Sequence, residues 1–340
     1  MQADKGMILA GDIGGTKCTL TSFAENESDL KPVFRFSAPT REFASIETLL
    51  KKFRAEAAKG GHELPRTQLT AAAFGVAGAI VNDRVVTNNL PWVVEGRSLA
   101  DTLDLDASRT LLINDLVAAA SSLAHLRESD LLQLNQGSSL PHAPKALISA
   151  GTGLGEAILF WDGQRYRVFP SEASLTDFAP RNDREVQLLL TLRERMPRVC
   201  TEEIVSGRGF RTIHQILFPE VHHRFLDDPG ADVAADITQQ ALTGSCRACM
   251  ETLQVWIEAY GAEAGNMALR VLPFGGVYVA GGIAVKILPK MKDGSFVRAF
   301  SDKAMLSTQL SRIPIYVVLN EDAPVMGAAY EALAVLRRLN

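Results

Sequence analysis

The chain has 340 residues, a formal net charge of -4 and 47% hydrophobic residues. This length predicts two domains of about 150 residues each, and the hydrophobic content suffices for large buried cores. The mild acidity argues against nucleic acid as the main partner, although it is compatible with a phosphorylated ligand. No apolar run reaches the roughly 18 residues that a membrane span requires, so no membrane partner is expected.

The N-terminus and the cysteines together predict a cellular location. Residues 1–6 lack the basic segment and the long apolar run of a signal peptide. The four cysteines, Cys18, Cys200, Cys246 and Cys249, are too few for a disulfide framework in so long a chain. We therefore expect a reduced, cytoplasmic protein.

The first part of the chain has the pattern of an α/β unit. A helix predicted at 45–59 begins with Ser45, a good N-cap residue, and ends at Gly60-Gly61. A polar stretch at 135–144, which contains proline and serine, separates this unit from the next. Strands are expected at 8–12, 17–23, 33–38, 70–74 and 110–113, with a further helix at 116–126.

The second part repeats the plan of the first. Residues 8–23 read as a strand, a glycine turn and a second strand, and residues 146–161 follow the same order. We therefore predict a small lobe of residues 1–117, completed by a C-terminal helix at 325–340, and a large lobe of residues 118–324. The other elements expected in the large lobe are helices at 183–196 and 237–271 and strands at 277–280 and 315–319.

Two glycine turns occupy matching places in this repeat, Asp12-Ile13-Gly14-Gly15-Thr16-Lys17 and Gly151-Thr152-Gly153-Leu154-Gly155. Glycine lets bare backbone approach an anion, so the N–H groups of both turns are expected to bind phosphate. The first turn lacks the residue spacing of a P-loop. A dinucleotide fingerprint would open a helix, whereas a strand pattern follows the second turn. Alone, either is typical of an ordinary tight turn. Further glycine turns lie at 279–283 and 206–209, each before a helix.

Two acidic residues follow strands. Asp12 leads into the first turn, where its carboxylate suits the water shell of Mg²⁺; the alternative is an Asx-type turn cap. Asn114-Asp115 ends a short strand before a helix, where both residue types cap helices well. The functional alternative makes Asp115 a general base for a substrate hydroxyl, because phosphoryl transfer mainly requires positioned groups and a proton acceptor.

Cysteine and histidine pairs raise the question of a metal. Cys246-Arg247-Ala248-Cys249 lies within a helical pattern at 237–260. One such pair without a second pair or a histidine partner is weak evidence for zinc. Reduced cysteines on a helix face are therefore predicted, with redox or metal chemistry as the alternative. His222-His223, in a loop, is predicted to be a solvated pair, with metal binding as the alternative.

The chain carries an ordered set of short motifs, which are Asp12-Ile13-Gly14-Gly15-Thr16, Asn89-Leu90-Pro91-Trp92, Asn114-Asp115, Gly151-Thr152-Gly153-Leu154-Gly155, Asp177-Phe178-Ala179-Pro180, Glu202, Ser206-Gly207, Phe274-Gly275-Gly276-Val277 and Ala280-Gly281-Gly282. This set resembles that of the bacterial-type ATP-dependent glucokinases, within the hexokinase–actin–Hsp70 superfamily. The resemblance covers nearly the whole chain. It implies an α/β, two-lobed actin-like ATPase (ribonuclease H-like) fold, in which each lobe is a mixed sheet with helices and the ligand cleft lies between the lobes.

The resemblance also implies the reaction, which is ATP-dependent phosphorylation of the 6-hydroxyl of a glucose-like hexose with Asp115 as the catalytic base. ATP and Mg²⁺ are the implied cofactors, and Asp12 holds the metal through water. Family members often form homodimers. The implied sugar ligands are Asn89, Asn114, Glu172 and Glu202. The implied nucleotide ligands are Asp12, Gly14, Gly15, Thr16, Lys17, Gly151, Thr152 and Gly153, with Gly281 and Gly282 under the adenosine.

One turn departs from the family pattern. Where the family reads Pro-x-Glu-Gly-Gly-His-x-Asp-Phe-Ala-Pro, Ala173-Ser174-Leu175 replaces both glycines and the sugar-binding histidine. A site that loses a hydrogen-bonding partner discriminates less between substrates, so weakened or altered sugar specificity is expected. The alternative is a paralogue that senses a sugar or a nucleotide without efficient turnover. Glu156 replaces an apolar residue after the second turn, where it either opposes phosphate binding or faces solvent.

Overall fold

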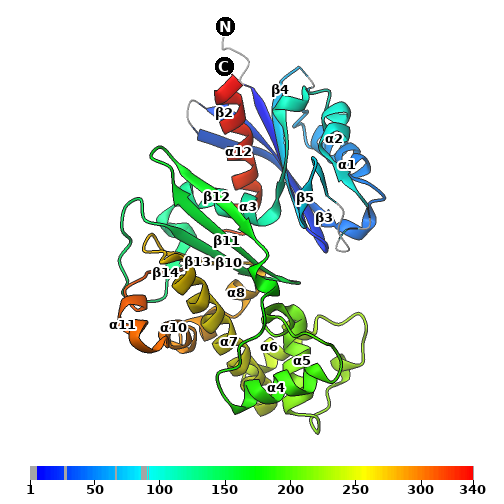
Figure 1. Cartoon of the computed structure of the whole chain (residues 1–340). Helices are drawn as coiled ribbons and strands as arrows, with labels where there is room; N and C mark the ends of the chain where they lie inside the picture. Colours follow the sequence, from blue (N-terminus) through cyan, green and yellow to red (C-terminus); the bar gives the residue numbers. More distant parts are fainter. Residues whose placement is uncertain (1–5, 27–28, 66, 86–89, 91, 340) are drawn as a thin grey trace. The chain divides into compact units, whose positions relative to one another are not determined.

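The computed structural model describes residues 6–26, 29–65, 67–85, 90 and 92–339 (Figure 1). The chain divides into two compact units, Met1–Leu126 with Asp322–Asn340, and Arg127–Glu321. The boundary placed at 117/118 from the sequence falls inside a helix of the first unit, because that helix continues to Ser121. Over the described residues, no helix combines the length and the apolar character that a membrane span requires.

Within its described residues, the first unit contains a five-stranded mixed sheet with the strand order β3-β2-β1-β4-β8. β1 pairs with β2 antiparallel and with β4 parallel, and β4 pairs with β8 parallel. The predicted meander and the two later strands are therefore confirmed. The strands are β1 (Met7–Ile13), β2 (Lys17–Asn26), β3 (Asp29–Pro39), β4 (Leu69–Val76) and β8 (Thr110–Asn114), and a small sheet adds β5 (Ile80–Val81), β6 (Arg84–Val85) and β7 (Val94–Glu95). The helices are α1 (Ile46–Lys59), α2 (Gly96–Leu103), α3 (Asp115–Ser121) and α12 (Ala323–Leu339).

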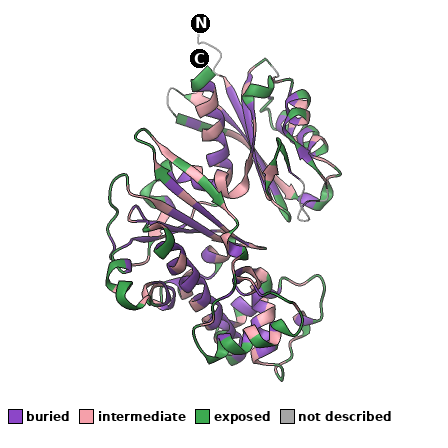
Figure 2. Cartoon of the chain, viewed as in Figure 1, coloured by how far each residue is buried: buried purple, intermediate pink, exposed green. Residues whose placement is uncertain are grey.

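The two faces of this sheet bury different side chains. Successive residues of a strand point to opposite faces. In β1, Leu9 and Ile13 join the core formed with α1 and α2, whereas Ile8 and Ala10 join the core formed with α12 and Ala118 of α3. In Figure 2, the central strands of this sheet and much of α12 are coloured as buried. Asp12 has the same parity as Ile8 and Ala10, so its side chain belongs to the face that α3 covers.

The second unit repeats this plan. Its described residues contain a sheet with the order β12-β11-β10-β13-β14-β9, in which β10 pairs with β11 antiparallel and with β13 parallel. This order matches that of the first unit, with β9 added beside β14, so the predicted internal repeat is confirmed. The strands are β9 (Leu131–Gln133), β10 (Lys145–Ala150), β11 (Leu154–Trp161), β12 (Tyr166–Ser171), β13 (Val277–Ala280) and β14 (Ile315–Val318). The helices are α4 (Asp183–Arg193), α5 (Gly207–Leu217), α6 (Val233–Leu242), α7 (Arg247–Val271), α8 (Gly282–Lys286), α9 (Leu288–Met291), α10 (Ser295–Ser301) and α11 (Ser307–Leu310).

Helix α7 packs against the central strand of the second sheet. Trp256 and Tyr260 of α7 are fully buried. The hydroxyl of Tyr260 donates to the carbonyl of Ile148 at 3.3 Å and accepts from the N–H of Ala150 at 3.2 Å. Ala150, the last residue of β10 before the second glycine turn, is therefore hydrogen-bonded to α7.

The long helix predicted at 237–271 is interrupted. α6 ends at Leu242, Gly244 has a φ of +70°, and α7 begins only at Arg247. Glycine tolerates this left-handed conformation, which ends one helix and redirects the chain into the next. Cys246 is consequently the N-cap residue of α7. The prediction that it lies inside a helix is wrong.

Candidate active site

Asp12 and Asp115 are neighbours in the first unit. Gly75 of β4 pairs with Asp12, and a side chain at Gly75 would meet the Cβ of Ala118 at 2.8 Å and the Cα of Asp115 at 3.5 Å. The glycine therefore allows the N-terminus of α3 to approach the sheet beside Asp12. Burial and, next, the charge of Asp115 raise the pKa of Asp12 to about 7, while Lys17 acts in the opposite direction. Two close carboxyl groups of this kind favour a bound cation.

The start of α3 fixes Asn114 and Asp115. The side-chain oxygen of Asn114 accepts the N–H groups of Leu116 at 2.9 Å and Val117 at 3.3 Å, and its amide donates to the carbonyl of Gly78 at 3.1 Å. Asp115 Oδ1 also accepts the N–H of Leu116, at 2.9 Å. The capping role of Asn114 is thus confirmed, and its amide has one further N–H to offer a ligand.

The first glycine turn is braced from the end of β3. The N–H of Gly14 donates to the carbonyl of Lys17 at 3.0 Å. Thr40 Oγ1 donates to the carbonyl of Gly14 at 2.7 Å, and the N–H of Thr40 donates to the carbonyl of Thr16 at 3.0 Å. Gly15, Thr16 and Lys17 are exposed at the tip of the turn. Sequence reasoning missed Thr40, because nothing in its local pattern distinguishes it from other threonines.

Glu202 holds the second glycine turn. Its Oε2 accepts the N–H of Leu154 at 2.9 Å, and its Oε1 accepts from Arg208 at 2.7 Å. A Cβ at position 153 would lie only 2.6 Å from Glu202 Oε2, so a side chain there would displace this carboxylate from its present position. Within the turn, the N–H of Gly151 donates to the carbonyl of Gly153 at 2.8 Å.

Three of the predicted glycine turns meet in the second unit. The N–H of Gly207, at the start of α5, donates to the carbonyl of Gly151 at 2.8 Å. Gly281 has a φ of +90°, and a Cβ there would lie 2.5 Å from the carbonyl of Ala150. The structure thus assembles the turns around residues 151, 207 and 281 at one end of β10 and β13, where α8 begins at Gly282.

The turn that departs from the family pattern lies beside Glu202. Ala173–Leu175 forms a 3₁₀ turn after the exposed Glu172. The N–H of Thr201 donates to the carbonyl of Thr176 at 3.0 Å, which joins this turn to the segment that carries Glu202. The side chain of Leu175 is 48% exposed, so burial does not explain a leucine there. Asn89, the remaining predicted sugar ligand, lies outside the described residues.

Glu156 points into the second unit. It is directly opposite Ile148 in the hairpin, so both side chains face α7, and Glu156 is only 1% exposed. Burial and then the neighbouring Glu263 raise the pKa of Glu156 to about 8, whereas Arg270 lowers it. Arg270 pairs with Glu263 at 3.1 Å. The solvent-facing alternative for Glu156 is therefore wrong, and burial together with Glu263 favours the protonated form of its carboxyl group.

Comparisons with known proteins agree with this architecture. A family model described as Glucokinase matches residues 9–335. The chain is 38% identical over 343 residues to a glucokinase of Nostoc sp., covering 95% of this chain and 98% of that protein. The crystal structure of a glucokinase from an Antarctic psychrotroph has a TM-score of 0.79 and 25% identity, covering 96% of this chain and 99% of that one.

A more distant structure extends the fold comparison. A ROK family glucokinase from Streptomyces griseus, solved in complex with glucose and AMPPNP, has a TM-score of 0.66 and 20% identity. The match covers 97% of this chain and 100% of that chain. This likeness shows that both proteins have the two-lobed, actin-like fold. Since the family model and the sequence relative both span nearly the whole chain, the protein belongs to the glucokinase family of ATP-dependent sugar kinases.

Proposed function

We propose that this protein transfers the γ-phosphoryl group of ATP to the 6-hydroxyl of a glucose-like hexose, with Asp115 as the base that accepts the hydroxyl proton. The observation that carries the proposal is the placement of Asp115 at the start of α3, beside Asp12 and on the same unit as the first glycine turn. The carboxylate of Asp115 is held by the N–H of Leu116 in the first turn of α3, so it can align the acceptor oxygen of the sugar. Its remaining task in phosphoryl transfer is to accept the proton of the hydroxyl.

The phosphates of ATP are assigned to the glycine turns. Gly14, Gly15, Thr16 and Lys17 supply backbone N–H groups and one ammonium group, and Gly151, Thr152 and Gly153 supply the second set. Gly281 and Gly282 lie under the adenosine. Asp12 would hold Mg²⁺ through water, and the metal would neutralise charge on the transferred phosphate. The raised pKa of Asp12 fits this role, because a nearby cation would offset both the burial of this carboxylate and the repulsion from Asp115.

The sugar is assigned to Asn89, Asn114, Glu172 and Glu202, whose amide and carboxylate groups match hydroxyls that both donate and accept. The ligands of the Streptomyces griseus structure, glucose and AMPPNP, support the substrate pair by family likeness. Leu175 offers no hydrogen bond where the family has a histidine. We therefore infer weakened or altered discrimination between hexoses at the turn of residues 173–175.

The exposed Leu175 also favours a second candidate, a sensor that binds the sugar or the nucleotide without efficient turnover. A coupled assay with ATP and Mg²⁺ across hexoses and amino sugars separates the two, with calorimetry of each ligand in parallel. Turnover of about 1–100 s⁻¹ on any hexose supports the kinase. Binding of a sugar without turnover on any member of the panel supports the sensor. The homodimer implied by family likeness is tested by light scattering of the same sample.

A further inference from the structure

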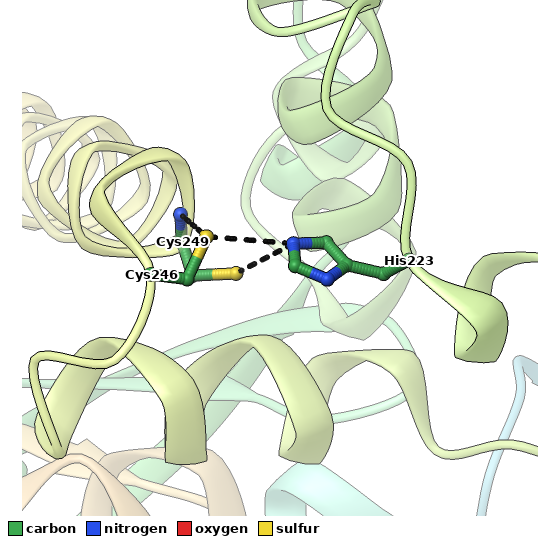
Figure 3. A group of neighbouring side chains, drawn as sticks. All are labelled: His223, Cys246 and Cys249. Carbon is green, nitrogen blue, oxygen red and sulfur yellow. Dashed lines mark hydrogen bonds between the residues drawn. The ribbon is translucent and has the colours of Figure 1, made fainter.

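Three potential metal ligands converge in the second unit, away from the glycine turns. Nε2 of His223 lies 3.4 Å from Sγ of Cys246 and 3.6 Å from Sγ of Cys249 (Figure 3). All three ligand atoms lie within 4.8 Å of one another. His223 comes from the segment between α5 and α6, whereas both cysteines come from the start of α7.

Hydrogen bonding alone accounts poorly for this arrangement. One imidazole nitrogen carries either a single proton or a single lone pair, so Nε2 can make a good hydrogen bond with only one of the two thiols. A zinc ion bound tetrahedrally, with Zn–S of about 2.3 Å and Zn–N of about 2.0–2.1 Å, separates sulfur and nitrogen ligands by about 3.6 Å. The two observed distances match that separation.

The local backbone builds the cluster. Cys246 is the N-cap residue of α7, and its Sγ accepts the N–H of Cys249 at 3.4 Å, which brings both sulfurs to one side of the first turn. The ring of His223 stacks on Phe225, with centroids 4.8 Å apart. Cys249 is buried, and Cys246 and His223 are partly buried. The adjacent His222 is instead exposed and pairs with Asp227 at 2.7 Å.

We propose that His223, Cys246 and Cys249 bind one zinc ion, with water as the fourth ligand. Two thiolates and an imidazole suit zinc, whereas Mg²⁺ and Ca²⁺ prefer oxygen ligands. Binding releases the two thiol protons to solvent, so the bound unit carries no net charge. The thiol of Cys249 donates to Oε1 of Gln240 at 3.9 Å; once this sulfur is a thiolate it has no proton to donate, so the Gln240 amide must turn over and present its NH₂ group to the metal-bound sulfur.

The ion would join the loop after α5 to the first turn of α7. The same helix reaches the glycine turns, because the indole N–H of Trp256 donates to the carbonyl of Ser206 at 3.0 Å. Ser206 is the N-cap of α5 and precedes Gly207. The metal therefore stabilises the packing of α7 against the segment after α5, and through Trp256 it supports the glycine turn at Ser206-Gly207. It takes no part in the phosphoryl transfer itself.

The test uses the full chain purified without chelator, and zinc per chain is measured by elemental analysis. The protein is then stripped with a chelator and titrated with Co²⁺, which gives thiolate charge-transfer absorption when sulfur is a ligand. We expect one equivalent of metal, a higher melting temperature with Zn²⁺, and no such rise with Mg²⁺. Cys246→Ser, Cys249→Ser and His223→Ala should each weaken binding by at least about 10–100-fold.

Two matched variants serve as controls. His222→Ala removes the neighbouring histidine, and Cys200→Ser removes a cysteine from another segment; both should bind metal as the unchanged protein does. The proposal is overturned if the unchanged protein binds no zinc and shows no thiolate–cobalt absorption. It is equally overturned if the absorption survives Cys246→Ser with Cys249→Ser, or if both thiols are found in a disulfide. Because the unchanged protein gives a decisive result, poor folding of a variant does not leave the question open.

Discussion

Glu202 accepts the backbone N–H of Leu154 at 2.9 Å, so one carboxylate joins the segment assigned to the sugar to the glycine turn assigned to ATP phosphate. Its other oxygen accepts from Arg208, next to the N-terminal residue of α5. A residue assigned to sugar binding thus also fixes the backbone of the second turn. Substrate contacts and phosphate contacts within this unit are therefore coupled through a single side chain.

Glu202→Gln should raise the KM of both ATP and sugar. The amide keeps an oxygen for Leu154 but loses the charge that holds Arg208, and a hydrogen bond to a charged group contributes about 1.5–3 kcal/mol. This predicts a loss of about ten- to a hundredfold in kcat/KM for both substrates, measured by steady-state kinetics. Glu203→Gln is the matched control, since Glu203 reaches the same guanidinium at 3.6 Å. Equal losses of kcat/KM in both variants would show that the effect comes from the negative charge near Arg208 and not from the contact between Glu202 and the glycine turn.

Asp115→Asn should abolish most turnover and leave binding intact. The amide oxygen can still accept the N–H of Leu116, and Asn114 still caps α3, but the group at 115 no longer accepts a proton. Loss of a general base costs about 10²–10⁴-fold in kcat. The melting temperature should not fall, because the change also removes repulsion of Asp12. Calorimetry checks binding, and Asp101→Asn, on the exposed side of α2, is the control. Unchanged kcat would exclude Asp115 as the base.

The features that the sequence predicted well have local determinants. Gly14 and Gly151 each stand between two strand patterns in the same order, so the repeat of hairpins is visible without any distant contact. Ser45 accepts the N–H of Thr48, and Thr48 Oγ1 in return accepts the N–H of Ser45. Such a capping box involves residues only three apart, so Ser45 can be recognised as the N-cap from the local sequence, and α1 begins at the next residue, Ile46.

The missed features depend on residues that are distant in sequence. Thr40 braces a turn 26 positions earlier, and His223 meets cysteines 23 and 26 positions later. Glu156 was ambiguous for a different reason. Its neighbours Leu154, Ala157 and Leu159 are all buried, so both faces of β11 are covered and alternation does not identify an outer face. Only the packing of α7 decides which side Glu156 occupies.

Leu175→His, combined with Ala173→Gly and Ser174→Gly, should improve glucose use. An imidazole restores a partner for a sugar hydroxyl, and a net hydrogen bond of about 1 kcal/mol corresponds to about fivefold in kcat/KM. Leu175 is 48% exposed, so its replacement removes little packing. Leu190→His, at a leucine of α4 that is 61% exposed, is the matched control. Unchanged kcat/KM for glucose would mean that the site serves another ligand, which the panel of hexoses then identifies.

Glu156→Gln should stabilise the second unit at alkaline pH. The folded pKa of about 8 lies above the value of about 4.3 for an unfolded chain, so the folded state binds more protons between these values. The stability that the protonated Glu156 contributes is therefore fully present below about pH 4 and is lost as the pH rises toward and through the folded pKa. Glutamine keeps the shape without the charge. Thermal unfolding from about pH 5 to 9 should show a flatter decline of the melting temperature for Glu156→Gln than for the unchanged protein.

The control is the exposed Glu194→Gln, whose melting temperature should follow that of the unchanged protein. If the decline is identical in all three proteins, then the buried pair of Glu156 and Glu263 does not govern alkaline stability, and another group that releases a proton over the same range must do so.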